Sequence, residues 1–336
     1  MPSGAESIVV TGGGGYCGSR LVPRLLDKGY RVTVYDIDFF GHGHLPAHRN
    51  LEFVKGDIRD VGHFARVLDG HDTVVHLACI SNDASFELDE ALSTSINLDA
   101  FEPLVQTAKR AGVRRFVYAS SSSVYGVSSE PDVTEEHPLV PLTLYNKFKG
   151  MCEPILRKYS DSDFTGAIFR PATVCGAAPR QRLDLSVNIL TNHAVSNGRI
   201  KVFGGAQLRP NLHIEDYCEV VELLVDAPTE KVVDQVFNVG YQNMSIMDIA
   251  LVVKGVVEGR MPELGDIDIE VLESDDPRSY HINSDKIRSV LGFTPARSVA
   301  MAVEDLVTAF ADGRLPDSMS DDRYYNVRTL KAIQAR

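Results

Sequence analysis

A tyrosine and a lysine four residues apart, Tyr145 and Lys149, are the residues of this chain best suited to proton transfer. They lie in a stretch that predicts a helix over residues 144–159, so both side chains are expected on one helical face. A nearby ammonium group favours the phenolate and lowers the pKa of a tyrosine, which would let Tyr145 act as a base near neutral pH. The serines at 120–123, at the end of a predicted strand, offer a hydroxyl that could share a proton with Tyr145.

A glycine-rich stretch near the N-terminus predicts a phosphate-binding turn. It follows a strand predicted over residues 7–11, contains glycines at 12–15 and 18, and opens a helix predicted over residues 16–28. Such glycines permit a tight turn and close approach of the backbone to a pyrophosphate, whose charge lies at the helix N-terminus. Asp36, at the end of the second predicted strand, would accept ribose hydroxyls and repel a 2′-phosphate. The pattern therefore favours NAD over NADP.

Further cofactor contacts are expected where other parallel strands end at the same edge of the sheet. Asp57 follows the third predicted strand, where it either meets the adenine or caps a helix. In full, the residues predicted to bind NAD are Gly12, Gly15, Tyr16, Cys17, Gly18, Asp36, Asp57, Ile58, Leu77, Ala78, Asn97, Tyr145 and Lys149.

The elements that must position these residues alternate between short apolar runs and amphipathic segments. Strands are predicted at residues 7–11, 31–36, 51–57, 73–78, 114–120 and 165–170. Helices are predicted at residues 16–28, 61–68, 88–111 and 144–159, the last one kinked by Pro154. Strands that are apolar on both faces and separated by helices predict an α/β fold, a parallel sheet covered on both sides.

The regular alternation ends after residue 175, and the remaining sequence predicts a smaller α+β lobe. We therefore expect a cofactor-binding domain at residues 1–175 and a substrate-binding lobe at residues 176–336. Residues 212–240 are expected to return to the first sheet, so that the two lobes interleave.

Composition excludes several classes of partner. The 336 residues include 34 Lys and Arg against 46 Asp and Glu, a net charge of −12, with no basic run. This argues against nucleic acid as a partner. The five cysteines are scattered without metal-ligand or disulfide spacing, so we expect no metal site and a reducing compartment. The sequence contains no leader-like segment and no apolar run long enough to span a membrane, which predicts a cytoplasmic protein with no membrane partner.

Taken in order, these motifs resemble the extended short-chain dehydrogenase/reductase family, in particular its NAD-dependent nucleotide-sugar epimerases and dehydratases, over nearly the whole chain. The resemblance implies a Rossmann-type doubly wound parallel sheet with a smaller α+β lobe that binds a nucleotide-diphosphate sugar. Segments 209–216 and 278–280 are similar to family segments whose arginines bind the sugar-nucleotide diphosphate. In an acidic protein those arginines could instead form surface ion pairs.

By position, the resemblance makes Ser121 the catalytic serine beside Tyr145 and Lys149, with Ser122 as the alternative. The residues expected to bind the nucleotide sugar are Ser81, Ser121, Ser122, Thr173, Arg182, Asn188, Arg209 and Arg278.

The same resemblance indicates the reaction. Related 4,6-dehydratases carry an Asp-Glu pair at the positions of Ser122 and Ser123, so dehydration is disfavoured. A nucleotide-sugar 4-epimerase that keeps NAD tightly bound and forms a transient 4-keto sugar is favoured instead. Relatives dimerise through helices that match residues 88–111 and 144–159, which predicts a homodimer.

Two alternatives remain. Many epimerases have Asn and Tyr where this chain has Thr173 and Cys175, and residues 179–188 are similar to dehydrogenases of nucleotide-activated heptoses. A net 4-dehydrogenase or 4-ketoreductase acting on a hexose or heptose is therefore open. A non-catalytic dinucleotide-sensing protein with the same fold is the other interpretation.

Overall fold

A seven-stranded parallel sheet forms the centre of the larger lobe in the computed structural model, which describes residues 7–128, 130, 132–274 and 279–334. The strand order is β10-β6-β5-β4-β1-β2-β3. The strands are β1 (Ser7–Thr11), β2 (Arg31–Asp36), β3 (Leu51–Lys55), β4 (Thr73–His76), β5 (Arg115–Ala119), β6 (Thr165–Pro171) and β10 (Val236–Val239). β1, β4 and β5 are buried along their whole length, because helices cover both faces of the sheet.

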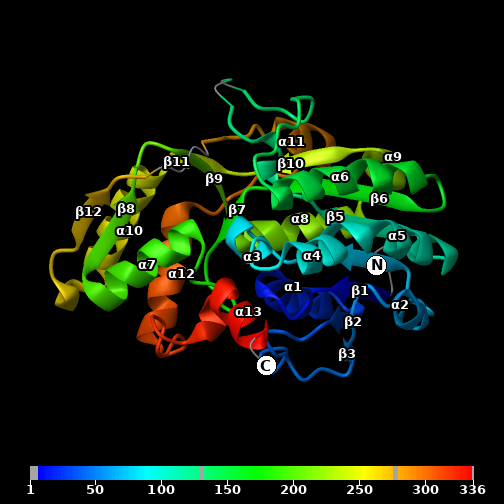
Figure 1. Ribbon diagram of the computed structural model, residues 1–336, viewed down its shortest axis with the longest axis horizontal. Coiled ribbons are helices and arrows are strands. Elements are labelled where there is room, and N and C mark those ends of the chain that lie inside the picture. The colour runs from blue at the N-terminus through cyan, green and yellow to red at the C-terminus, as the bar shows by residue number, and fades with distance from the viewer. Residues whose placement is uncertain (1–6, 129, 131, 275–278, 335–336) are drawn as a thin grey trace.

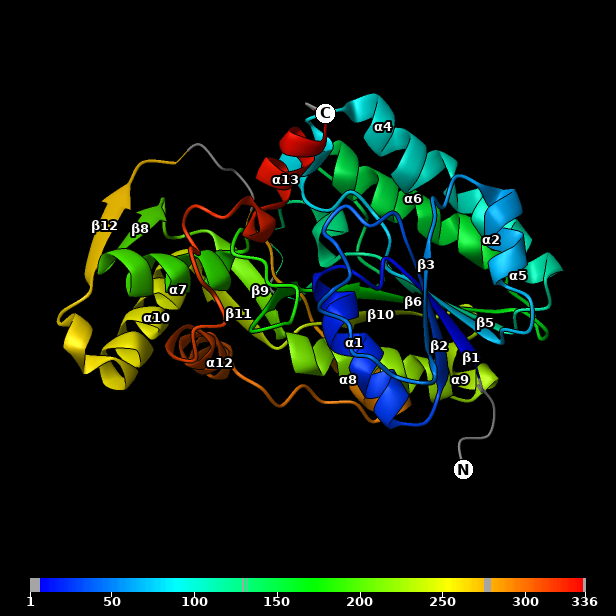
Figure 2. The same ribbon diagram turned by 90° about the horizontal axis from the view of Figure 1, so that it is seen from below.

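The helices divide between the two faces of this sheet (Figure 2). α1 (Tyr16–Asp27) and α8 (Ile214–Asp226) pack together on one face. α2 (Val61–Val67), α5 (Phe101–Arg110) and α6 (Leu144–Tyr159) cover the other. Each face buries its own apolar cluster. This doubly wound α/β arrangement confirms the predicted fold.

The smaller lobe has a separate core. α7 (Ser186–Asn197), α10 (Ile246–Arg260) and α12 (Val299–Ala311) pack on one another and enclose apolar side chains such as Ile200, Val253 and Val303. A parallel pair, β8 (Arg199–Phe203) and β12 (Asp268–Leu272), lies at its outer edge. A second sheet has the order β11-β9-β7, with bounds Gln242–Ser245, Leu208–His213 and Thr173–Cys175.

The chain crosses between the lobes more than once. β10 pairs with β6 in the large sheet, and the chain then returns to the smaller lobe. Two short helices also lie at this side of the large sheet: α9 (Thr229–Val232) contacts β6, and α11 (Asp285–Leu291) contacts β10. The C-terminal helix α13 (Asn326–Gln334) then packs against α3 (Asp83–Phe86) of the larger lobe (Figure 1). The lobes are thus held together by segments distant in sequence.

One helix differs from expectation. The helix predicted over residues 88–111 is divided into α4 (Glu90–Thr94), a π-helical turn (Ser95–Asp99) and α5. α6 has the predicted bounds with Pro154 inside it, and the Thr143 hydroxyl accepts a hydrogen bond at its first turn. Short 3₁₀ helices occur at Ser122–Tyr125, Pro262–Leu264 and Asp322–Tyr324. In the part of the chain that the structure describes, no helix is both long and apolar enough to cross a membrane.

Candidate active site

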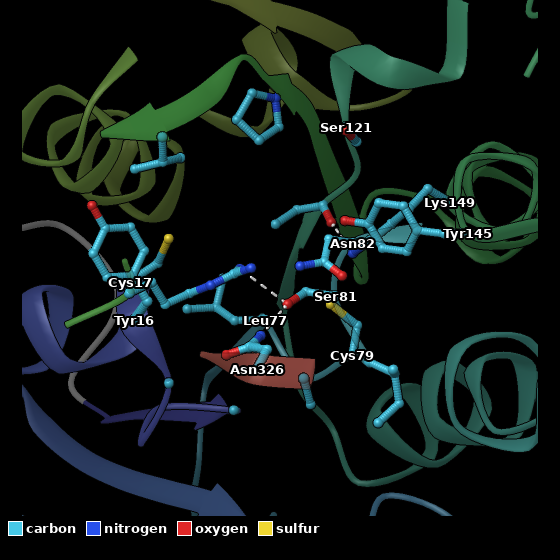
Figure 3. A pocket seen from close by; sticks show the side chains of 18 of the residues that line it. Tyr16, Cys17, Leu77, Cys79, Ser81, Asn82, Ser121, Tyr145, Lys149 and Asn326 are labelled. Atoms are coloured by element: carbon cyan, nitrogen blue, oxygen red, sulfur yellow. Dashed lines mark hydrogen bonds between the residues drawn. The ribbon is translucent and has the colours of Figure 1, made fainter. Parts of the chain in front are cut away.

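A cavity of about 420 Å³ lies at the carboxyl ends of β1, β4 and β5, between the large sheet and the smaller lobe. Parallel sheets bind ligands at this edge, where the strand order reverses. Most residues predicted for the site line this cavity: Gly12, Gly15, Tyr16, Cys17, Gly18, Asp36, Asp57, Ile58, Leu77, Ala78, Ser81, Ser121, Tyr145, Lys149, Thr173, Arg182 and Arg209. Tyr16 and Cys17 lie on one side of it, opposite Tyr145 and Lys149 (Figure 3). The fold thus brings together side chains from both lobes.

The glycine turn leaves no room for side chains. Gly12 has a φ of 73°, and a Cβ there would lie 2.6 Å from the backbone nitrogen of Ala78. A Cβ on Gly18 would lie 2.5 Å from the Cα of Gly13, which packs α1 directly onto the turn. The turn therefore brings backbone amides and the N-terminus of α1 to the cavity, an arrangement that suits a pyrophosphate.

Asp36 is held by the turn that it faces. Its carboxylate accepts hydrogen bonds from the amides of Gly14 (2.9 Å) and Asp38 (2.8 Å). Burial raises the pKa of Asp36, while these amide hydrogen bonds oppose the rise. The carboxylate is thereby fixed at the cavity wall with lone pairs left for a ribose hydroxyl. Together with the glycine turn, these residues fit a bound NAD.

Asp57 lines the same end of the cavity but is engaged with its neighbour. The Arg59 guanidinium donates to both oxygens of Asp57, at 3.0 Å each through Nε, and holds the pKa of that carboxyl below its usual value. The alternative role of Asp57, as the cap of the following helix, belongs to Asp60, whose carboxylate accepts a hydrogen bond from the backbone amide of His63 in the first turn of α2. Contact of Asp57 with the adenine stays a prediction.

The expected electrostatics of Tyr145 are reversed in this structure. Burial raises the pKa of the Tyr145 phenol well above its ordinary value, and the negative charge of Asp83 adds to the rise. Lys149 does not offset it, because its ammonium donates to the carbonyl of Ala119 (2.8 Å) and lies 5.2 Å from the centre of the Tyr118 ring. The predicted lowering of the Tyr145 pKa by Lys149 is therefore wrong for the protein without ligands.

The serine turn presents two of its hydroxyls to the cavity. Ser121 Oγ lies 2.7 Å from Ser123 Oγ, and the Ser123 hydroxyl donates to the Asn146 side chain on α6. Both serines line the cavity with Tyr145. The alternative residue, Ser122, is 1% exposed and does not line it, because the 3₁₀ turn directs its hydroxyl inward. Of the two candidates, geometry brings Ser121 to the site.

Three further predictions fall elsewhere. Asn97 lies in the π-helical turn and pairs with the backbone nitrogen and oxygen of Ile80, both at 2.8 Å, so it positions a cavity loop without lining the cavity. Asn188 is fully buried and donates to the Arg182 carbonyl (2.8 Å), which makes it a support for the wall. Arg278 lies outside the described residues. In this structure Asn97 and Asn188 support the cavity wall, and their direct contact with a ligand stays a prediction.

The wall on the side of the smaller lobe carries Thr173 and Arg209. The Arg209 guanidinium lies 5.8 Å from the centre of the Tyr280 ring, which also lines the cavity. Cys175 is buried without lining the cavity, and burial raises its thiol pKa to about 12. The thiol therefore stays protonated and cannot act as a nucleophile at neutral pH.

Several lining residues were missed by the sequence interpretation. They include Ser123, Arg180, Asp184 and Asn326. Asn82 and Asp83, which follow Ser81 in the chain, also line the cavity. Asn82 has a φ of 69° and a ψ of 158°, a conformation that is costly for any residue other than glycine and is found mostly at functional sites. Arg180 stands in the motif next to Arg182, so it could have been found from sequence. No sequence signal marks Asn326, which reaches the cavity from the C-terminal helix.

Comparisons with known proteins agree with this geometry. The model of the NAD dependent epimerase/dehydratase family matches residues 8–240. A UDP-glucose 4-epimerase from Lactobacillus helveticus is 27% identical over 312 residues, covering 86% of this chain and 92% of that protein. A dTDP-glucose 4,6-dehydratase from Streptomyces niveus is also 27% identical, covering 91% of this chain and 93% of that protein.

A solved structure has the same architecture. DesIV, a dTDP-glucose 4,6-dehydratase from Streptomyces venezuelae that was solved with NAD bound, superimposes with a TM-score of 0.80 at 25% identity. The match covers 92% of this chain and 98% of that chain. Similarity therefore extends over both lobes.

Proposed function

The chain belongs to the NAD dependent epimerase/dehydratase family, and from this premise we propose that it is a nucleotide-sugar 4-epimerase. Membership makes it an NAD-dependent enzyme of the nucleotide-sugar epimerase or dehydratase type, as the sequence motifs predicted. The choice of 4-epimerisation within that group is the proposal. In the proposed reaction the configuration at C4 is inverted, with no net oxidation and no loss of water.

The observation that carries the proposal is the serine turn beside Tyr145. Where related dehydratases carry an Asp-Glu pair, this chain has Ser122 and Ser123. Ser122 is buried away from the cavity, and Ser123 is hydrogen-bonded to Ser121 and to Asn146. Elimination of water needs an additional acid and base at the sugar. A turn with hydroxyls alone supports proton exchange at one oxygen and does not supply that pair.

The chain's own residues would then act on the C4 hydroxyl. When bound, NAD supplies the acceptor and donor of the C4 hydride together with a positively charged ring. Tyr145 Oη takes the hydroxyl proton, directly or through Ser121 Oγ, and returns it to the oxygen of the 4-keto sugar. The Lys149 ammonium, fixed by the Ala119 carbonyl, keeps a positive charge in the same cavity and favours the phenolate once the site is filled.

Inversion requires the 4-keto sugar to turn while the nucleotide stays bound. Arg209, at the wall formed by the smaller lobe, is suited to hold the diphosphate during that turn. Because NAD is regenerated in each cycle, tight binding of the cofactor is an advantage. The homodimer predicted from the sequence stays a prediction.

A net 4-dehydrogenase or 4-ketoreductase is the second candidate. Thr173 forms the cavity wall where many epimerases have a longer, amide-bearing residue, and Cys175 does not reach the cavity at all. The altered sugar contact at this wall keeps a net oxidation or reduction at C4 open. Both reactions share the step at Tyr145.

The test is to incubate the purified protein with UDP-, GDP-, ADP- and dTDP-sugars without added cofactor, and to follow products by NMR. Mass spectrometry of the denatured protein identifies any dinucleotide it carries. A C4-inverted sugar formed by protein that carries NAD supports the epimerase. A 4-keto product, or turnover only with added NAD, favours the dehydrogenase, and a 4-keto-6-deoxy sugar would refute the argument from the serine turn.

Tyr145→Phe should lower turnover by about 10²- to 10⁴-fold without loss of bound NAD. Tyr159→Phe, at the other end of α6, is the matched control, because the Tyr159 hydroxyl bonds to Glu102 outside the cavity. Unchanged turnover in Tyr145→Phe would remove it as the base.

A further inference from the structure

Two arginines of the smaller lobe, Arg180 and Arg182, are buried in the wall of the cavity. Their side chains belong to the segment after β7, and they are only 6% and 7% exposed. Arg180 Nε and Arg182 Nη2 are shielded from solvent and find no hydrogen-bond partner among the described residues. Buried donors are nearly always satisfied, so two unsatisfied guanidinium nitrogens in one cavity indicate an absent acceptor.

The charges in this wall do not balance. Asp184 accepts a hydrogen bond from Arg182 Nε at 2.9 Å, which pairs that arginine. Arg180 forms no ion pair within 4.0 Å in the described part of the chain, and its Nη2 donates to the neutral Asn326 side chain (2.6 Å). Burial, and next the charge of Arg182, lower the pKa of Arg180 to about 9, which still leaves it cationic at neutral pH. The charges of Asp184 and Asp36 act on Arg180 without an ion pair within 4.0 Å, and a buried cation in that position favours an anionic ligand.

The arginine segment docks on the first turn of α1. The Arg180 backbone amide donates to Ser19 Oγ (3.1 Å), and the Tyr16 hydroxyl donates to the Gly176 carbonyl (2.7 Å). Burial raises the pKa of Cys17, in the same turn, to about 12, and the nearby charges of Arg182 and Arg180 oppose that rise. The guanidinium groups therefore share the space in front of the glycine turn and the N-terminus of α1, where anions are favoured.

We propose that Arg180 and Arg182 bind the pyrophosphate of the dinucleotide from the side of the smaller lobe, opposite the glycine turn. This inference rests on the proposed NAD-dependent function and adds residues from outside the nucleotide-binding layer. Guanidinium groups suit this ligand, because their donors form charge-assisted hydrogen bonds with phosphate oxygens.

Two other segments hold the arginine pair in place. Ser81 Oγ accepts from Arg182 Nη1 (3.1 Å) and from Asn326 Nδ2 (3.0 Å), and the second of these bonds is seen in Figure 3. The Asn326 backbone amide also donates to Asp184 (3.0 Å). The C-terminal helix, which begins at Asn326, therefore positions the arginines, and the donors are preorganised before the ligand arrives.

A diphosphate could also come from the nucleotide sugar, and binding measurements separate the two sources. ADP-ribose carries the cofactor's pyrophosphate, adenosine lacks phosphate, and UDP, GDP and dTDP represent the substrate. Isothermal titration would use full-length protein freed of copurified dinucleotide with charcoal. Arg180→Met is the main variant, and Arg66→Met, an exposed position on α2, has the same change in charge.

We expect Arg180→Met to weaken ADP-ribose binding by about 10- to 100-fold, with adenosine and nucleoside diphosphates bound as in the wild type. Arg66→Met should bind all ligands normally. Arg180→Lys should fall between, because it keeps the charge and loses the planar donors. The thermal midpoint of ligand-free Arg180→Met should stay level or rise, since an unpaired buried charge has been removed.

Equal ADP-ribose affinity in Arg180→Met and wild type would overturn the proposal. Selective loss of nucleoside diphosphate binding would overturn it as well, by assigning the pair to the substrate. If the wild type binds neither NAD nor ADP-ribose, the proposed NAD-dependent function itself fails, an outcome visible before any variant is made.

Discussion

Replacing Glu153 by glutamine should strongly destabilise the protein. Glu153 lies one turn after Lys149 on α6, and its carboxylate accepts hydrogen bonds from Arg170 Nε (2.9 Å) and Nη2 (2.6 Å) on β6. It also accepts from Ser120 Oγ (2.6 Å), at the start of the serine turn. The pair therefore joins the helix that carries Tyr145 to two segments behind the active site.

The magnitude follows from burial. The side chains of Glu153 and Arg170 are only 4% and 6% exposed. Burial alone would lower the pKa of Arg170, but the hydrogen bonds and charge of Glu153 raise it above its ordinary value, so Arg170 stays charged. Two unit charges about 4 Å apart interact by about 4 kcal/mol at an effective dielectric constant of about 20. Removing one partner of a buried pair typically costs about 3–5 kcal/mol. We expect Glu153→Gln to lose that amount.

The assay is urea unfolding followed by circular dichroism, since the chain contains no Trp. Asp234→Asn is the control, because Asp234 pairs with Arg157 of the same helix at the exposed surface and should contribute less than about 1 kcal/mol. Glu153→Gln combined with Arg170→Met removes both charges and should be less destabilised than the sum of the single variants. A loss for Glu153→Gln no greater than the control, or strict additivity, would refute the reasoning.

Three other variants test the site and its support. Gly18→Ala should abolish retention of NAD, measured by mass spectrometry of the released nucleotide, because the new Cβ would lie 2.5 Å from backbone of Gly13. Asp83→Asn should move the acidic limb of the pH profile of kcat/KM to lower pH, because the Asp83 charge raises the pKa of Tyr145 in the ligand-free protein and the base acts deprotonated. Arg115→Met should cost about 2–3 kcal/mol in urea unfolding, because the buried Arg115 guanidinium donates to the carbonyls of Leu224 in the last turn of α8 and of Ala227 just after it, both at 2.7 Å.

Each of these variants has a control on the same chain. A Cβ on Gly259 meets nothing within 4 Å, so Gly259→Ala should retain NAD. Asp69→Asn, at an exposed position, should leave the pH profile in place. Arg114→Met removes the exposed neighbour of Arg115 and should change stability little. NAD retention by Gly18→Ala, an unmoved pH profile for Asp83→Asn, or equal stability of the two arginine variants would contradict the respective argument.

Local patterns in the sequence predicted most of the larger lobe and the part of the site that this lobe contributes. β1, β2, β4 and β5 begin and end within two residues of the predicted runs, because strands buried on both faces must be continuously apolar. The glycine turn and Asp36 were found for a related reason: close packing and backbone approach require glycine at particular positions of one short segment. The helical spacing of Tyr145 and Lys149 is likewise local.

The π-helical turn was missed, because it depends on packing partners. Asn97 does not line the cavity, because its side-chain amide is hydrogen-bonded to the backbone of Ile80, 17 residues away in the sequence. The local propensities of the residues cannot predict a hydrogen bond over that distance in the sequence.

By itself the sequence determined the parallel sheet, the glycine turn, the candidate pair for proton transfer and the family. Only the tertiary structure decided which of Ser121 and Ser122 lines the cavity with Tyr145, how burial acts on that phenol, and that Arg180, Arg182 and Asn326 meet in the cavity wall. The physical reason is the distance in the sequence over which each interaction acts. Turn geometry and periodic burial are written within a few consecutive residues, whereas pKa values, unsatisfied donors and unpaired charges depend on groups that folding brings together from distant parts of the chain.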